Sequence, residues 1–567
     1  LQNVPLEPLE LKGLALQPVN RTTDSTRFDL ECHVWTREQG MEIVFVYNTD
    51  LFETASMQRM LQHYRLLLEQ LVEHPAQPVS QYRLLTEQEQ QQLQQWNQTQ
   101  QSYAATSLVE MFEQQVDATP DATAIVFENT RLDYRQLDEQ ANRLAHYLQA
   151  QGIGEGEIVG VCMERSIEMV VALYGIIKAG AAYVPLDPDY PESRLAFMLE
   201  DTGLSLVLSQ SHLAARLPAD KVRLLPMDTT DATDRFPAHR LKHSIQPDSA
   251  AYIIYSSGST GQPKGVINTH RGIVNRLCWM QQQFKLDEQD SVLQKTPYSF
   301  DVSVWEFFWP LISGARLIVA QPGGHKDPAY LSRVIQAHAV TTVHFVPSML
   351  KAWLDHLHSN TETAPATLRR VLCSGEALPY TLQQQFFAQF AEPVELHNLY
   401  GPTEAAIDVT HWQCQRNDSR HVVPIGVAIA NTQIHLLDEQ LQPVPVGIIG
   451  ELYIGGVQVA AGYLNRDALN AERFISDPFS HDPAARLYKS GDLARYLPDG
   501  SIEYIGRVDF QVKLRGQRIE LGEIEAALVS NDAIREAVVL CRQSGEEQQL
   551  LAYCTLEQPG DNTVNPL

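Results

Sequence analysis

The chain has 567 residues, of which 44% are apolar and 20% are charged, the composition of an ordinary globular protein of three or four domains. Its 43 Lys and Arg residues stand against 69 Asp and Glu residues, so the formal net charge is −26. A surface of this sign repels phosphate backbones and anionic lipids, which excludes nucleic acid and membranes as expected partners.

Residues 1–80 are predicted to form a small α/β unit. Apolar and polar residues alternate over 28–34, and a second β-rich run, MEIVFVY, occupies 41–47, which together indicate a hairpin. Apolar residues then recur at helical spacing over 57–71, and Pro75 follows them, so a helix is expected to end there.

Residues 81–106 are interpreted as a linker, because glutamine dominates much of this segment. Thr86 is followed three residues later by Glu89, the spacing of a capping box, which predicts a short helix. The composition of 86–101 otherwise favours a solvated spacer without chemistry of its own.

Residues 107–508 alternate helical patterns with short β-rich runs such as AIVFE, IVGVCM and AYIIYS. This alternation predicts an α/β fold whose large core is built from layers of mainly parallel sheet. The segment 433–456 carries strand and turn signals, so a small β-rich lobe is expected there. Residues 509–567 begin a small α+β domain, with one helix at 520–531 and two strands after it.

Other features bear on the compartment of the protein. The seven cysteines are scattered, odd in number and never spaced as CxxC, which favours the reducing cytoplasm over a disulfide framework or a zinc site. No apolar stretch reaches the roughly 18 residues that span a bilayer, and no signal-peptide pattern follows Leu1. Because the first residue is not Met, the chain is interpreted as a piece of a longer protein.

One loop carries a chemical signature. An apolar strand at 252–255 gives way to residues 256–265, which hold four hydroxyls, three glycines and the single cation of Lys264. Glycines let backbone N–H groups face inward, and hydroxyls and a lysine add donors and charge, a combination that suits a polyphosphate. The loop is not a Walker P-loop, because Pro263 precedes the lysine where that pattern requires glycine.

This loop, YSSGSTGQPKG, closely resembles the phosphate loop of the adenylate-forming enzymes. Within that superfamily the chain resembles the adenylation domains of nonribosomal peptide synthetases. Seven further family motifs occur in order and at family spacing, two before the loop and five after it, among them NLYGPTEAAID at 398–408, GELYIGGVQVAAGYLNR at 450–466 and RLYKSGDLARYLPDG at 486–500. The resemblance covers residues 107 to about 560, and residues 1–80 resemble the C-terminal end of a condensation domain.

The resemblance implies a reaction that needs ATP and Mg²⁺. An amino-acid carboxylate attacks the α-phosphate, giving an aminoacyl adenylate and pyrophosphate, and the thiol of a phosphopantetheine arm on a partner carrier domain then takes the acyl group. The condensation motif His-His-x-x-x-Asp-Gly is absent, so the N-terminal remnant is expected to be inactive. PGGHKD at 322–327 has lysine where a carrier domain has its modified serine, so the expected peptidyl carrier and condensation partners belong elsewhere in the assembly line.

The resemblance also assigns roles to residues. Lys264, Thr260, Glu404 and Thr403 are implied to be catalytic, and Glu404 is implied to hold Mg²⁺. The nucleotide is implied to contact Ser256, Ser257, Gly258, Ser259, Gly261, Gly375, Glu376, Ala377, Asn398, Tyr400, Asp492 and Arg507. In this scheme Tyr400 stacks on adenine and Asp492 accepts both ribose hydroxyls. Asp509 matches the family hinge, and a second family lysine lies beyond Leu567, so the last domain is interpreted as truncated.

The substrate positions of the family fall on Asp301, Val302, Trp305, His344, Leu372, Ser374, Leu399, Ile407 and Asp408. Asp301 is implied to pair with the α-ammonium group, and the size of Trp305 predicts a shallow pocket. The polar groups of His344, Ser374 and Asp408 need partners, which a small side chain with one hydroxyl supplies. The set resembles the serine pattern of the family, so L-serine is expected; the alternative is that His344 and Asp408 pair only with each other.

Three other functions compete with this interpretation. An acyl-CoA ligase of the same superfamily has no use for an anion at Asp301. An aminoacyl-tRNA synthetase is disfavoured by the absence of HIGH and KMSKS patterns and by the net charge of −26. A nucleotide-binding or scaffolding fragment without activity stays open, because the second lysine motif is missing from the chain.

Overall fold

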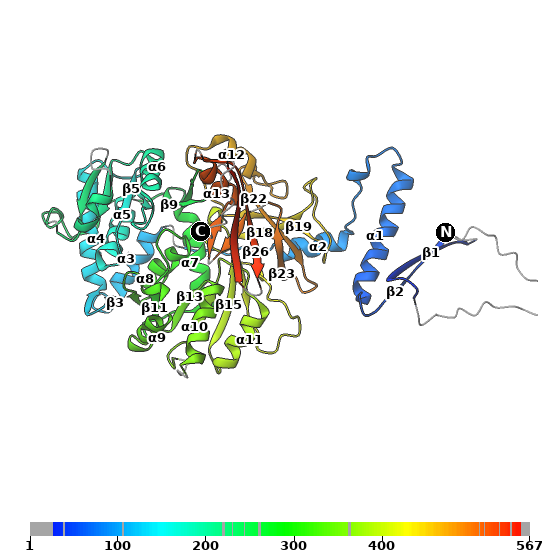
Figure 1. Ribbon diagram of the computed structural model, residues 1–567, viewed down its shortest axis with the longest axis horizontal. Coiled ribbons are helices and arrows are strands. Elements are labelled where there is room, and N and C mark those ends of the chain that lie inside the picture. Colours follow the sequence, from blue (N-terminus) through cyan, green and yellow to red (C-terminus); the bar gives the residue numbers. More distant parts are fainter. Residues whose placement is uncertain are drawn as a thin grey trace, which may run out of the picture. The chain divides into compact units, whose positions relative to one another are not determined.

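The computed structural model describes residues 26–37, 40–104, 107–217, 222–229, 231–242, 244–258, 262–360, 365–509, 511–514, 516–531, 533–544 and 547–556. Two compact units are found along the chain (Figure 1). The smaller unit comprises the residues up to Gln95 together with Asp438–Ile448. The larger unit comprises Trp96–Leu437 and the residues from Ile449 onward.

The smaller unit contains the predicted hairpin and helix. β1 (Leu30–Arg37) pairs antiparallel with β2 (Gly40–Tyr47), and the α-helix α1 (Thr54–Glu73) follows. A 3₁₀ turn, η1 (Val79–Gln81), leads to the short helix α2 (Glu87–Trp96). The alternation and helical spacing of the apolar residues are therefore confirmed as strand and helix signals.

The predicted capping box at the start of α2 is confirmed. The backbone N–H of Thr86 donates to Glu89 Oε2 at 2.9 Å, and that of Glu89 donates to Thr86 Oγ1 at 3.3 Å. Glu89 Oε1 also lies 2.8 Å from Nε2 of His63 on α1. This glutamate is buried, so the glutamine-rich helix is tied to its neighbour and is not a freely solvated spacer.

The larger unit contains two extended sheets of mainly parallel strands. The first has the order β20-β10-β9-β6-β5-β7-β8, and its strands are β5 (Ile158–Cys162), β6 (Ala182–Pro185), β7 (Leu206–Ser209), β8 (Arg223–Pro226), β9 (Ala250–Ser256), β10 (Lys264–Thr269) and β20 (Gly462–Tyr463). The strands from β9 to β8 are parallel, whereas β10 is antiparallel to both of its neighbours.

The second sheet has the order β17-β16-β15-β14-β13-β11-β12-β3-β4. Its strands are β3 (Thr123–Phe127), β4 (Thr130–Asp133), β11 (Ser291–Gln294), β12 (Arg316–Val319), β13 (Thr342–Phe345), β14 (Arg370–Cys373), β15 (Glu395–Tyr400), β16 (Thr410–Gln413) and β17 (Val427–Ala428). The six central strands are parallel, and antiparallel strands stand at both edges.

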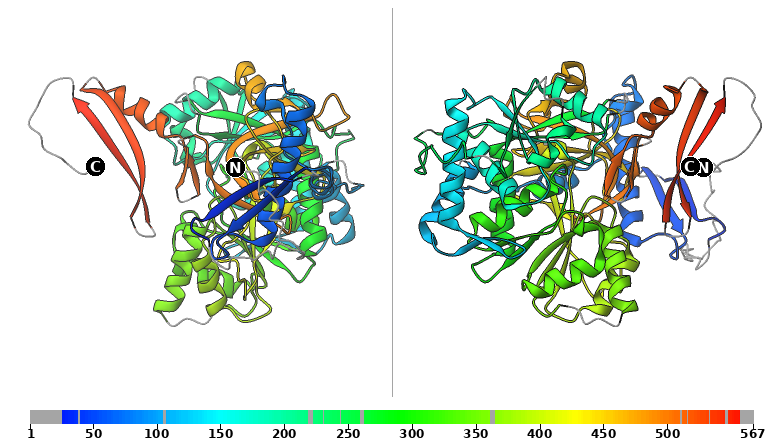
Figure 2. Two further views of the ribbon diagram at one scale, coloured as in Figure 1. Left: turned by 90° about the vertical axis from the view of Figure 1, so that its right-hand side faces the viewer. Right: turned by 60° about the vertical axis from the view of Figure 1, so that its left-hand side comes forward.

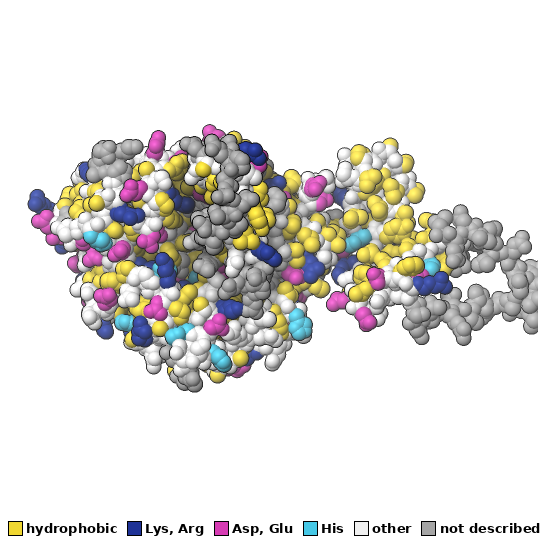
Figure 3. Space-filling view, in the orientation of Figure 1, with side chains coloured by type: hydrophobic (Ala, Val, Ile, Leu, Met, Phe, Trp, Pro, Cys, Tyr) yellow, Lys and Arg dark blue, Asp and Glu magenta, His cyan; other side chains and the backbone are white. Residues whose placement is uncertain are grey.

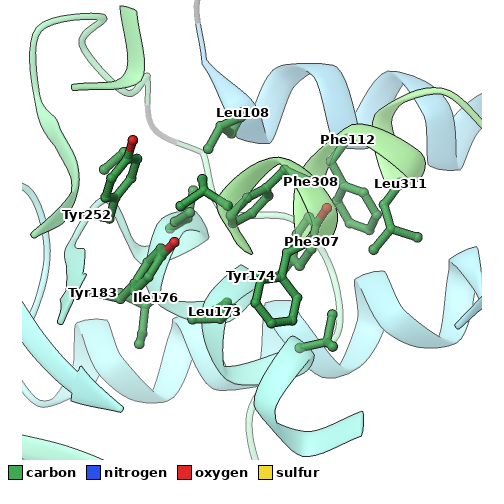
Figure 4. Close-up of a cluster of buried hydrophobic side chains, with 14 of the residues drawn as sticks. Leu108, Phe112, Leu173, Tyr174, Ile176, Tyr183, Tyr252, Phe307, Phe308 and Leu311 are labelled. Carbon is green, nitrogen blue, oxygen red and sulfur yellow. The ribbon is translucent and has the colours of Figure 1, made fainter. Parts of the chain in front are cut away.

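Helices cover these sheets: α3 (Leu108–Ala118), α4 (Tyr134–Ala150), α5 (Ile167–Ala179), α6 (Glu192–Thr202), α7 (His270–Phe284), α8 (Val302–Ile312), α9 (Pro328–Ala337), α10 (Pro347–Ser359) and α11 (Tyr380–Gln389). Three short 3₁₀ turns lie in the connections of the sheets: η2 (Ser211–Arg216) between β7 and β8, η3 (Gly324–Lys326) between β12 and α9, and η4 (Thr403–Ala405) between β15 and β16. One apolar cluster contains residues of both sheets and of α3, α4, α5, α7 and α8. Figure 4 shows its aromatic part, where the ring of Tyr174 lies 4.4 Å from that of Phe112 and 5.0 Å from that of Phe308.

An antiparallel lobe follows, as the turn-rich sequence predicts. It is formed by β18 (Thr432–Leu437), β19 (Gly450–Gly456), β21 (Phe474–Ser476), β22 (Arg486–Tyr496) and β23 (Ile502–Arg507), with α12 (Asp467–Arg473) beside it. The last elements, orange to red in Figure 2, are two hairpins and a helix: β24 (Val512–Leu514), β25 (Gln517–Ile519), α13 (Leu521–Val529), β26 (Ile534–Ser544) and β27 (Glu547–Leu556). The α/β class and the small α+β end are thereby confirmed.

On the face shown in Figure 3, acidic side chains lie scattered among basic ones and do not gather in one patch. The excess of acidic residues is thus spread over that face. Across the described part of the chain, no helix combines the length and the apolar character needed to cross a bilayer.

The end of the predicted linker is fixed to the antiparallel lobe. The side chain of Asn97 pairs with the backbone of Ile434 on β18, donating to its carbonyl and accepting from its N–H, both at 2.9 Å. Two residues further on, Thr99 O accepts from the backbone N–H of Asn431 at 2.8 Å. The ring of Trp96 packs 5.1 Å from that of Tyr496. The expectation of a solvated spacer is therefore wrong for this stretch.

We expect Asn97→Ala to lower the free energy of unfolding of the larger unit by about 1–3 kcal/mol, because the backbone N–H of Ile434 loses the Asn97 acceptor, while its carbonyl keeps only the hydrogen bond from the Tyr496 hydroxyl at 2.7 Å. Urea denaturation followed by fluorescence measures the change. Gln98→Ala is the matched control, because Gln98 is exposed and its loss is expected to cost less than about 0.5 kcal/mol. Equal midpoints for the two variants would show that the Asn97 contacts do not anchor the segment.

Candidate active site

A cavity of about 1000 Å³ lies in the larger unit, between the core and the segment that contains β24, β25 and α13. It is lined by several of the residues that the sequence analysis assigned to nucleotide or substrate: Ser256, Ser257, Asp301, Gly375, Thr403, Asp492 and Arg507. Ser259, Thr260 and Gly261 fall outside the described residues. The remaining predicted residues are not among those that line the cavity, and the contacts of most of them are given below.

The two ends of the glycine-rich loop are held side by side. Ser256 ends β9 and Lys264 begins β10, and the two residues are cross-strand partners. The backbone of Gly258 closely approaches that of Gln262. A Cβ atom at position 258 would stand only 2.0 Å from the carbonyl oxygen of Gln262. A side chain cannot be accommodated at this position, which explains the glycine.

Lys264 and Glu404 meet at the base of this loop. Lys264 Nζ lies 3.1 Å from Glu404 Oε1, and both side chains are buried. Glu404 is carried by η4, next to Thr403, whose backbone carbonyl accepts from Asn268 Nδ2 at 3.0 Å. The structure thus brings together the two charged groups that the sequence analysis placed on the phosphates and the metal.

A tyrosine that sequence reasoning missed lies between these two charges. Tyr463 OH donates to Glu404 Oε1 at 2.8 Å and accepts from Lys264 Nζ at 3.0 Å, and Lys264 Nζ stands 4.4 Å from the centre of its ring. Tyr463 belongs to β20, which pairs with β10. Asn470 on α12 fixes its backbone, accepting from the N–H at 2.6 Å and donating to the carbonyl at 2.9 Å.

We expect Tyr463→Phe to reduce kcat/KM for ATP by about 10–100-fold, because a hydrogen bond to a charged group contributes about 1.5–3 kcal/mol. The apparent affinities for ATP and for Mg²⁺ should fall, and the KM for the amino acid should stay unchanged. Tyr453→Phe is the matched control, since the Tyr453 hydroxyl donates instead to Glu451, at 3.3 Å. Equal kinetics for wild type and Tyr463→Phe would contradict a positioning role.

A second group of side chains surrounds Asp492. Its Oδ2 accepts from the hydroxyl of Tyr400, and its Oδ1 accepts from Arg507 Nη1 at 2.6 Å. Arg507 also forms two hydrogen bonds with Asp509, Nε to Oδ1 at 2.6 Å and Nη2 to Oδ2 at 2.8 Å. Both carboxylate oxygens of Asp492 therefore already have protein donors, which ribose hydroxyls would have to share or replace.

Only one of the residues predicted to surround adenine lines the cavity. Gly375 lines it, whereas Asn398 is buried and donates its amide N–H to the carbonyl of Pro424 at 2.8 Å. Glu376 bridges two segments, accepting from the backbone N–H of Ser348 at 2.9 Å and from that of Gly516 at 2.6 Å. Ala377 follows in the same turn. Glu376 thus ties the β24–β25 hairpin to the core, a contact with no signal in the sequence.

Asp301 forms part of the cavity wall at the start of α8. Burial raises the pKa of this carboxyl to about 7, and the hydrogen bond from the Thr403 side chain is the largest effect that opposes the rise. A carboxylate in this setting gains from a cationic partner, because an opposite charge at close range favours its ionised form.

The other predicted substrate positions are buried and mainly apolar. Their apolar members belong to the large core cluster: Val302, Trp305, Leu372, Leu399 and Ile407. Ile407 has φ +83°, a conformation that is rare for a β-branched residue and that turns the chain between η4 and β16. His344 Nε2 lies 3.0 Å from Ser374 Oγ, and the His344 ring stands 6.2 Å from that of Trp305.

Asp408 has a partner that sequence reasoning missed. Its Oδ2 accepts from Nη2 of Arg276 on α7 at 2.8 Å, and both side chains are buried. The alternative that His344 and Asp408 pair only with each other is therefore wrong, because His344 contacts Ser374 and Asp408 contacts Arg276. A lone arginine in an amphipathic helical pattern gives no sign of such a pairing.

The donor set also bears on the implied Mg²⁺. Across the described ranges no group of three or more His, Cys, Asp or Glu side chains gathers around one point, so a metal cage made of protein alone is not found there. Mg²⁺ is usually held through one or two carboxylates together with substrate phosphates. The single buried carboxylate of Glu404 beside the glycine-rich loop fits that mode of binding.

Comparison with known proteins agrees with this geometry. A family described as AMP-binding enzyme matches residues 112–464, and the condensation domain family matches residues 4–94. The chain belongs to the AMP-binding enzymes. This adenylation domain and its preceding segment are 44% identical over 551 residues to phosphinothricin tripeptide synthetase PhsB of Streptomyces viridochromogenes, covering 95% of this chain and 45% of that protein.

Other synthetases are similar to the chain as well. Vanchrobactin synthetase VabF of Vibrio anguillarum is 42% identical over 543 residues, covering 93% of this chain and 19% of that protein. The nonribosomal peptide synthetase FmoA3, solved in its α-methyl-L-serine-AMP bound form, has a TM-score of 0.79 at 30% identity and covers 89% of this chain and 57% of that chain. The chain is thus an adenylation domain of the nonribosomal peptide synthetase type, and it spans less than half of these two curated relatives.

Proposed function

We propose that this domain activates a small hydroxylated amino acid, L-serine, as its adenylate and passes it to a phosphopantetheine thiol. The observation that carries the proposal is the placement of Asp301 on the cavity wall, with the Lys264–Glu404 pair at the base of the phosphate loop. The first group suits an α-ammonium and the second suits phosphates. Asp301 lines the cavity together with Ser256 and Thr403, the residues next to which Lys264 and Glu404 are held, so the chemistry for both reactants lies at or directly behind one cavity wall.

In this proposal the protein positions the reactants and compensates charge. Lys264 and the loop from Ser256 hold the phosphates and support departing pyrophosphate, and Glu404 holds Mg²⁺. When bound, that ion neutralises phosphate charge and polarises the phosphoryl group. Tyr400, Asn398 and residues 375–377 bound the adenine site.

The ribose is assigned to Asp492, with Arg507 and Tyr400 orienting its carboxylate. The C-terminal segment is proposed to turn about Asp509 between the two half-reactions. The side chain of Asp509 accepts two hydrogen bonds from Arg507, which connects the proposed hinge to the proposed ribose site. A carrier domain is the proposed source of the thiol, and a condensation domain is the proposed consumer of the acyl product.

The side-chain preference rests on the groups behind Asp301. Trp305 limits the depth of the site, and His344, Ser374 and Asp408 are its polar members. A buried polar group needs a partner, and a short hydroxyl can provide one without filling more volume. The likeness to FmoA3, solved with an α-methyl-L-serine adenylate, supports this preference without deciding it.

We expect the KM for the amino acid to rise about tenfold for each pH unit below 7, because Asp301 then gains a proton and loses the charge that pairs with the ammonium. Above pH 7 the KM should level off until the substrate ammonium itself loses its proton. Steady-state pyrophosphate exchange from pH 5.5 to 8.5 measures this, with the KM for ATP as the internal reference. A flat profile for the amino acid would contradict its pairing with Asp301.

The class of substrate is tested by trapping the adenylate with hydroxylamine. The test uses this chain and the same chain continued beyond Leu567 through the lysine motif that the family resemblance implies, hereafter the extended chain. A panel of α-amino acids is compared with their des-amino acids, such as serine with 3-hydroxypropionate. Hydroxamate formation from serine alone supports the proposal. Equal formation from the des-amino acid would favour an acyl-CoA ligase, and nucleotide binding without any hydroxamate in the extended chain would favour an inactive nucleotide-binding fragment.

A further inference from the structure

A buried arginine stands beside the predicted substrate side-chain site. Arg276 lies on α7 and is 0% exposed, and its guanidinium carbon stands 4.9 Å from the ring centre of Trp279. Its one ion pair among the described residues is with Asp408, through Nη2 and Oδ2 at 2.8 Å. Among the described residues, the hydrogen bond to the Asp408 carboxylate is made through Oδ2. Its other oxygen, Oδ1, is therefore open to a further donor.

Several buried polar atoms in the same region have no hydrogen-bond partner among the described residues. They are Nε and Nη1 of Arg276, the hydroxyl of Tyr252, Nε1 of Trp305 and Nδ1 of His344. The charges of Asp301, Arg276 and Asp408 act on the Tyr252 hydroxyl, and the ring of Trp305 lies 6.2 Å from that of His344. Orphaned buried groups are rare, and a cluster of them indicates a place for a ligand or ordered water.

The charges in this region balance in a specific way. Asp301 is the carboxylate proposed for the α-ammonium, so it is neutralised when an amino acid binds. Asp408 is neutralised before binding, because Arg276 already pairs with it. Burial raises the pKa of Asp408, and Arg276 is the largest influence opposing that rise. Asp408 is therefore paired before binding, yet its carboxylate still offers an acceptor. The charges of Lys513 and Lys295 also reach the site, acting on Asp408 and on His344 respectively, and they likewise disfavour a further cation.

We propose that Arg276 is a positioning residue for substrate specificity. Its guanidinium donates to Oδ2 of Asp408 and balances the carboxylate charge, so that Oδ1 is left to accept a hydrogen bond from an uncharged donor on the substrate. This inference rests on the proposed function. It predicts that the site accepts a hydroxyl and rejects an ammonium group of the same size, because a third cation beside Arg276 would have no counter-ion.

The matched probe is 2,3-diaminopropionate, which carries an ammonium group where serine carries its hydroxyl. In the wild type we expect serine to bind this chain at least about 100-fold more tightly than the diamine, from the cost of one unpaired charge. In Arg276→Met the carboxylate of Asp408 becomes available to a side-chain cation, and the preference for serine over the diamine should fall at least tenfold. Isothermal titration calorimetry of both amino acids measures this without requiring turnover.

Two further variants separate positioning from damage. Arg276→Lys keeps the cation and should retain rejection of the diamine. The double variant Arg276→Met/Asp408→Leu replaces an ion pair by two apolar side chains and removes the acceptor, so it should not gain affinity for the diamine, while its preference for serine over alanine should fall at least tenfold. Thermal unfolding checks each variant, and a merely structural role for Arg276 would lower the affinity for serine and for the diamine together.

The possible outcomes distinguish an error in the proposed substrate from an error in the role of Arg276. A wild type that binds neither serine nor threonine in preference to alanine overturns the proposed substrate. A wild type that prefers serine, together with an Arg276→Met variant whose ratio of serine to diamine is unchanged, overturns the role of Arg276 alone. If Arg276→Met does not fold, the double variant decides: an unchanged preference for serine over alanine overturns the inference, and a fall supports it.

Discussion

Serine is expected to exceed alanine by roughly 10⁴–10⁵-fold in kcat/KM for pyrophosphate exchange by the extended chain, because a site built around a hydroxyl leaves its own groups unpaired when the hydroxyl is missing. Here those groups are Asp408, held by Arg276 at 2.8 Å, and His344, 3.0 Å from Ser374. Threonine keeps the hydroxyl and adds one methyl group. It should therefore fall behind serine by only about 10–200-fold.

Glycine and leucine are the controls for this comparison. Glycine lacks both methylene and hydroxyl and should resemble alanine, whereas leucine should be excluded by the buried ring of Trp305. Equal rates with serine and alanine would contradict hydroxyl recognition. A preference for leucine would contradict the shallow site as well, and it would leave the assignment to the AMP-binding enzymes untouched.

The second large effect is expected at the phosphate site. Glu404→Gln or Lys264→Met should each lower kcat by about 100–1000-fold, which corresponds to about 2.7–4 kcal/mol for one electrostatic group in the transition state. The two side chains face each other at 3.1 Å and are buried, so each single variant also leaves a charge without its partner. Stability must therefore be measured beside activity.

The double variant Lys264→Met/Glu404→Gln separates these two effects. If the residues act as one unit, its kcat should lie close to that of either single variant, while its stability should recover. Glu439→Gln changes an exposed glutamate and serves as the control for loss of negative charge. Retention of wild-type exchange and of its Mg²⁺ dependence by Glu404→Gln would contradict the assigned role.

The sequence predicts those parts of the molecule that depend on local pattern. Alternating and helical spacing located β1, β2 and α1, and the capping box of Thr86 and Glu89 located α2. The glycine-rich loop was recognisable because its chemistry lies in consecutive residues. Lys264 and Glu404 are 140 positions apart, and only resemblance to a family placed them at one site.

Other contacts had no local signal, because each joins segments far apart in the chain. Tyr463 reads as an ordinary strand residue until β20 pairs with β10 and brings its hydroxyl between two charges. Arg276 reads as the polar side of a helix until α7 is packed under the loop of Asp408. Asn97 lies in a glutamine-rich stretch whose composition predicts exposure to solvent. Its side-chain amide nevertheless forms hydrogen bonds with the backbone carbonyl and the backbone N–H of Ile434.

The most direct test of the account is to offer the extended chain all twenty amino acids at once with ATP and Mg²⁺, and to identify the adenylate by mass spectrometry. Seryl-AMP is expected as the dominant product, with threonyl-AMP as the main minor one, and no product is expected when Mg²⁺ is withheld. A dominant adenylate of any amino acid without a side-chain hydroxyl would contradict the assignment of the substrate. Failure to form any aminoacyl adenylate would contradict the proposed activity.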